Sequence, residues 1–114
     1  MKKVTFPITF THSQSKKSYD FYPGIVLDTM SPEMFKYSEI YKACQNLAMT
    51  KTTLAPVPLY MNRDRVIYKN SRHLDMNHVR NIIGDYYIIF CFPEGCEKEI
   101  DKIVKRFNIQ KYKP

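Results

Sequence analysis

The chain has 114 residues, 44% apolar and 25% charged, which is the length and composition of one globular domain. Its 18 lysines and arginines outnumber 11 acidic residues, and the formal net charge of +7 is typical of proteins that contact polyanions. No apolar run approaches the roughly 18 residues that span a membrane, and the first residues are too polar for a signal peptide, so we expect a cytoplasmic protein.

The first predicted elements are two strands that form a hairpin. Residues 4–11 read as a strand in which Pro7 favours an edge position or a bulge. A polar, turn-like stretch follows, and residues 19–27 return as a second strand that is interrupted at Pro23 and Gly24. We therefore expect an antiparallel pair near the start of the chain.

A long amphipathic helix is predicted to begin near Ser31. Ser31 suits the N-cap, Pro32 suits the first helical position, and Glu33 complements the positive end of the helix dipole. Apolar residues then recur at helical spacing, which predicts a single buried stripe. The stripe consists of Tyr37, Ile40, Tyr41, Cys44, Leu47 and Ala48.

The second half of the chain is predicted to contain a hairpin, a short helix, a buried strand, a second main helix and an edge strand. In chain order these span residues 57–61 with 66–68, 75–84, 86–92, 96–108 and 109–112. Residues 86–92 form an uninterrupted run of apolar and aromatic residues, which is typical of a strand buried on both faces. The helix after it carries a stripe of Ile100, Ile103, Val104 and Phe107.

Together these elements predict a single α+β domain over residues 1–114, with one mixed or antiparallel sheet and two main helices. We expect both helix stripes to face the strand at 86–92. The second half resembles the ferredoxin-like arrangement, in which strands and helices alternate and the helices pack against the sheet. Such a fold would not by itself determine the function.

Basic residues are concentrated in residues 1–18, in residues 61–80 and from residue 102 onward. In the last helix, acids at its start and bases at its end complement the helix dipole without any ligand. The helix dipole does not explain the basic residues of the 61–80 segment. This segment combines arginine, whose planar guanidinium binds phosphate through two hydrogen bonds, with aromatic rings that stack on unpaired bases. We therefore predict RNA or DNA contact through Arg63, Arg65, Lys69, Arg72 and Arg80, with Tyr68 as the stacking residue.

A protein partner is the second hypothesis. The chain has nine tyrosines, and exposed tyrosine with arginine is also the composition of protein-binding hot spots. The size of the chain and its Lys, Asn, Ile and Tyr content fit a phage or viral origin. On this hypothesis the protein binds a host protein and inhibits or redirects it.

Catalysis and metal binding are weaker hypotheses. A small endoribonuclease would use His12, His73 or His78 with an arginine as acid, base and phosphate clamp. Cys96, at a helix start, is the one thiol with a reason for a lowered pKa. The spacings of His73 and His78 and of Cys91 and Cys96 permit a zinc site, but their order is unusual. We expect a non-enzymatic protein with no metal and no cofactor, and the odd number of cysteines argues against a disulfide framework.

Overall fold

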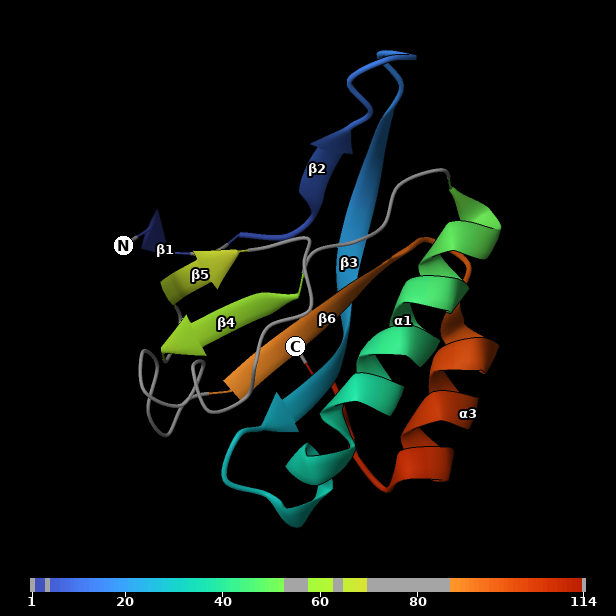
Figure 1. Cartoon of the computed structure of the whole chain (residues 1–114). Helices are drawn as coiled ribbons and strands as arrows, with labels where there is room; N and C mark the ends of the chain where they lie inside the picture. Colours follow the sequence, from blue (N-terminus) through green and yellow to red (C-terminus); the bar gives the residue numbers. More distant parts are fainter. Residues whose placement is uncertain (1, 4, 53–57, 63–64, 70–86, 114) are drawn as a thin grey trace.

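The computed structural model has a curled antiparallel sheet with two helices lying side by side against one face, and the predicted α+β class is confirmed (Figure 1). The structure describes residues 2–3, 5–52, 58–62, 65–69 and 87–113. No helix in this part of the chain is long and apolar enough to cross a membrane. In chain order the elements are β1 (Lys2–Lys3), β2 (Ile8–Thr11), β3 (Ser18–Asp28), the 3-10 helix η1 (Pro32–Lys36), α1 (Tyr37–Lys51), β4 (Leu59–Asn62), β5 (Arg65–Lys69), β6 (Tyr87–Pro93), α3 (Glu97–Phe107) and β7 (Gln110–Lys111). The predicted helix at 75–84 lies outside the described residues.

The strand order is β1-β5-β4-β6-β3-β2, with β7 also paired to β3, and all these pairings are antiparallel. Strand β6 lies between β3 and β4, so these two run in the same direction and α1 connects them. Strand β3 lies between β6 and β7, which likewise run in the same direction and are connected by α3. The two β-α-β units interleave as in the ferredoxin-like arrangement. That resemblance therefore includes β3, in the first half of the chain.

Both predicted hairpins form. Strands β2 and β3 pair from Ile8 with Phe21 to Thr11 with Ser18, and β4 pairs with β5. Strand β2 begins only at Ile8, so the predicted strand at 4–11 is too long at its start; Pro7, which has no backbone N–H to donate to a ladder, precedes it directly. The pairing of β3 with β6 shifts register between Pro23 and Ile25, where the sequence predicted an interruption.

Strand β6 is buried on both faces, as its composition predicts. Ile88, Phe90 and Phe92 belong to a core cluster with residues of both helices, including Ile40 and Ile100. This confirms that the α1 stripe packs on this strand, whereas α3 joins the same core by packing against α1, β3 and β7. The alternate residues of β6, Ile89 and Cys91, point to the other face of the sheet and belong to a second cluster with Phe21, Ala48, Leu59 and Met61. Ala48 is the member of the α1 stripe that packs in this second cluster.

The first predicted helix starts with a 3-10 turn, and α1 proper begins at Tyr37. Ser31 occupies the N-cap of that turn with an extended backbone, as predicted, but its side chain makes no capping hydrogen bond. The Ser31 hydroxyl instead donates to the backbone carbonyl of Asp28 at 2.7 Å. This bond stabilises the turn between β3 and η1 rather than the helix end.

Candidate functional site

Three of the six residues predicted to contact nucleic acid lie in strand β5, and these are Arg65, Tyr68 and Lys69. The other three lie outside the described residues: Arg63, Arg72 and Arg80. Strand β5 is next to the end of the sheet, between β4 and β1.

The pairing of β1 with β5 brings two basic segments together from opposite parts of the chain (Figure 1). Lys3 lies directly opposite Arg65, and Lys2 lies opposite Val66. Neither strand contains an acidic residue. The sequence shows that the N-terminus is basic, but only the long-range register associates it with the predicted contact segment.

A second basic element is the tip of the β2–β3 hairpin, which extends away from the two helices in Figure 1. Lys16 and Lys17 are exposed there. The turn is closed by the backbone N–H of His12, which donates to the Lys17 carbonyl at 2.8 Å. The Ser15 backbone N–H donates to His12 Nδ1 at 3.1 Å, which gives this histidine a role in the turn. The other two histidines of the ribonuclease hypothesis, His73 and His78, lie outside the described residues.

The cysteines considered for zinc or catalysis are buried on different sides of the sheet. Cys96 packs with the helices, whereas Cys91 belongs to the cluster on the opposite face. Within the described ranges, no group of three or more His, Cys, Asp or Glu residues could hold a metal ion. The pKa of Cys96 is raised rather than lowered by its position at the helix start, because burial of the thiol outweighs the opposing attraction of Lys51.

A groove of about 630 Å³ lies where the bulge of β3, the end of β6, the start of α3 and the end of the chain meet. This volume is within the range of small-molecule binding sites. Aromatic side chains and three charged groups line the groove. The aromatic residues are Phe6, Tyr22, Phe92 and Tyr112, and the charged residues are Glu94, Glu97 and Lys111.

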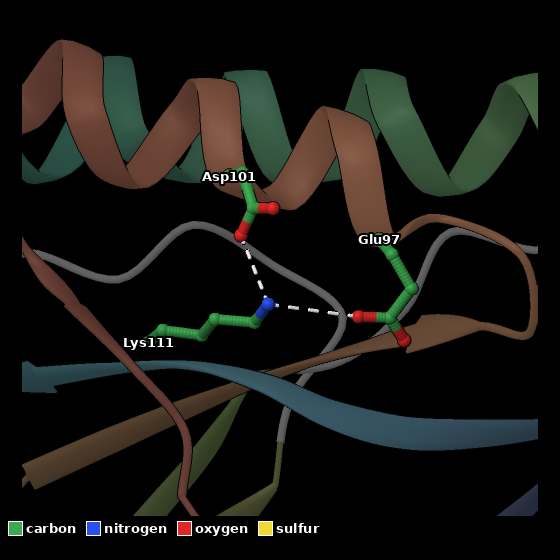
Figure 2. Close-up of polar contacts among 3 residues, drawn as sticks. All are labelled: Glu97, Asp101 and Lys111. Atoms are coloured by element: carbon green, nitrogen blue, oxygen red, sulfur yellow. Dashed lines mark hydrogen bonds and ion pairs between the residues drawn. The ribbon is translucent and has the colours of Figure 1, made fainter.

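Lys111 joins the end of the chain to helix α3 beside this groove. Figure 2 shows its ammonium group between two carboxylates of that helix, 2.9 Å from Asp101 Oδ1 and 3.7 Å from Glu97 Oε2. The hydrogen bond to Asp101 is the main reason that the pKa of Lys111 is raised above its usual 10.5. The contact connects β7 to α3 on this side of the molecule.

Comparisons of the chain with protein-family models, with curated proteins and with solved structures found no match. The charge, burial and spacing of the described residues are therefore the basis for a functional assignment. Two features stand out among these residues. One is the basic strand pair β1–β5, and the other is the aromatic groove beside Lys111.

We expect Lys111→Met to lower the thermal midpoint at neutral pH. The raised pKa means that the ammonium form is stabilised by folding. This stabilisation is fully present below pH 10.5, the usual lysine value, and is lost as the pH rises through the higher pKa of the folded state. Thermal denaturation of both proteins at neutral and strongly alkaline pH measures the effect, and the two midpoints should converge at alkaline pH. Lys113→Met, at an exposed position two residues further on, is the control. The ion pair would have no role in stability if both substitutions had the same effect at neutral pH.

Proposed function

We propose that this chain is a small, cytoplasmic, non-enzymatic protein that binds RNA or DNA. The observation that supports the proposal is the pairing of β1 with β5, which sets Lys3 directly opposite Arg65. Basic residues directly opposite each other destabilise an antiparallel pair. A polyanion bound along these two strands would offset that repulsion, and phosphates are the groups that arginine and lysine bind most readily.

The proposed contact surface extends the prediction from the sequence. It consists of Lys2, Lys3, Arg63, Arg65, Lys69, Arg72 and Arg80, with Tyr68 as the stacking residue. The exposed lysines of the hairpin tip, Lys16 and Lys17, supply a second point of contact with a long strand. Binding through phosphates would depend strongly on salt concentration, because bound counterions are released from the nucleic acid.

The test is a triple variant, Lys2→Ala with Lys3→Ala and Arg65→Ala. Affinity for a labelled oligonucleotide is measured by fluorescence anisotropy at several salt concentrations. Removing three phosphate contacts should lower the slope of log affinity against log salt by roughly two to three units. Single-stranded and duplex probes are compared, and Tyr68→Ala should weaken single-strand binding more, by about 1–3 kcal/mol.

A matched control removes three exposed lysines from the helices, with Lys42→Ala, Lys102→Ala and Lys105→Ala. This variant has the same net charge as the test variant, so general attraction to a polyanion affects both equally. Equal loss of slope in the two variants, or no binding by the unmodified protein at low salt, would contradict the proposal.

Two apolar side chains at one end of the helical layer support a protein partner as the second candidate. Phe35 in η1 is 81% exposed, and Met30 in the turn before it is 63% exposed. Aromatic residues and methionine are enriched at protein interfaces. In this second candidate function, the chain is a phage- or virus-type protein that binds a host protein and inhibits or redirects it. Phe35→Ala would then abolish capture of that protein from a host lysate.

A further inference from the structure

We propose that the groove beside Lys111 binds a basic side chain, arginine or lysine, of a partner peptide. The groove is formed by residues other than those of the β1–β5 surface, so this inference does not depend on nucleic-acid binding. Its aromatic walls, the placement of its charges and its size all support this assignment.

The walls of the groove are suited to a cation. Tyr22 is 40% exposed on β3, although its register partner Phe92 is buried. Phe6 and Tyr112 pack edge to face with ring centroids 5.9 Å apart. The backbone N–H of Tyr112 donates to the Gly24 carbonyl at 2.9 Å, which holds the end of the chain against the β3 bulge. Cations bind over the faces of such rings, and an arginine guanidinium also stacks on them.

The charges of the groove also favour a cation. The ammonium of Lys111 is 2.9 Å from Asp101 and 3.7 Å from Glu97, so these two carboxylates share it (Figure 2). With Glu94 added, three carboxylates stand against this one ammonium group, so the groove is locally negative on a chain of net charge +7. Glu97 lies in the first turn of α3 and complements the helix dipole, but Glu94 precedes that helix and has no such role. A phosphate or a carboxylate would be repelled here.

The size of the groove favours a side chain over a free ion. A volume of about 630 Å³ is far more than one ammonium group needs. Lysine and arginine have long apolar stems that pack along apolar surface while the charged end meets polar groups. In the groove, the stem would lie against the rings and the charged end would contact Glu94 and Glu97.

The probe is the peptide acetyl-Gly-Arg-Gly-amide, and the neutral control is the same peptide with citrulline in place of arginine. Binding is followed by amide chemical shifts of isotope-labelled protein. We expect saturable shifts at Tyr22, Gly24 and Tyr112 with the arginine peptide. The citrulline peptide should bind about tenfold more weakly, the equivalent of about 1.4 kcal/mol. Equal affinity for the two peptides would overturn the inference.

A double variant, Glu94→Gln with Glu97→Gln, tests the carboxylates, and Tyr22→Leu tests the aromatic wall. Each should lower the affinity for the arginine peptide severalfold. Glu39→Gln, at an exposed position on α1, should leave that affinity unchanged. All four positions are at least partly exposed, so thermal midpoints should confirm that each variant is folded. Undiminished peptide binding by the double variant, or preference of the groove for an Asp-containing peptide, would also overturn the inference. Oligonucleotide affinity should not fall in the double variant, so this test and that of the proposed function can fail separately.

Discussion

Ile40→Ala should lower the free energy of unfolding by roughly 2–5 kcal/mol, the range measured for large-to-small truncations in well-packed cores. Ile40 is 0% exposed and lies in the core cluster between α1 and the sheet. Its truncation leaves a cavity there, because neighbouring side chains relax only partly. Urea denaturation of the two proteins measures the difference as a lower midpoint with an unchanged slope.

Met49→Ala is the control for this prediction. Met49 lies on the same helix and is 51% exposed, so its truncation removes little buried surface. Its midpoint should remain close to that of the unmodified protein. If Ile40→Ala left the midpoint unchanged as well, the burial of this helix against the sheet would be wrong.

Gly24→Ala should cost about 1–3 kcal/mol of stability, because it overpacks the core. A Cβ atom at this position would lie 2.6 Å from Cδ2 of Phe92 and 2.9 Å from Cδ1 of Ile100. Both neighbours are buried, so they cannot move toward solvent without losing contacts. Thermal or urea denaturation measures the loss.

A double-mutant cycle identifies the cause. Ile100→Val removes the Cδ1 atom that the new methyl group would meet, at the usual cost of a small truncation. The double variant should then lose less stability than the sum of the two single variants, because the contact with Ile100 is no longer overpacked. Strict additivity would show that Ile100 does not cause the loss.

The local elements of this protein were largely predictable from its sequence, because their patterns report burial directly. The unbroken apolar run that became β6 indicates a strand covered on both faces, and the structure confirms it. The stripes at helical spacing predicted α1 and α3 and the burial of both in one core, but α3 packs mainly against β3, β7 and α1 rather than on that strand. Pro23 and Gly24 predicted where β3 is interrupted, but the predicted strand at 4–11 begins only at Ile8, after Pro7. The sequence predicted the N-cap position of Ser31, but not that the first turn is 3-10 or that the Ser31 hydroxyl bonds to Asp28 instead of capping it.

The candidate sites depended on tertiary structure, because each combines residues that are far apart in the chain. Charge counts alone identified β5 as basic, but only long-range pairing brings Lys3 opposite Arg65. The groove combines Phe6, Tyr22, Glu94 and Tyr112, and no spacing in the sequence relates them. The sequence by itself therefore determined which segments are buried and which are basic, through local periodicity and composition. The pairing of distant strands decided which basic segments meet. That pairing and the packing of α3 against β3 decided where aromatic rings and carboxylates form a groove.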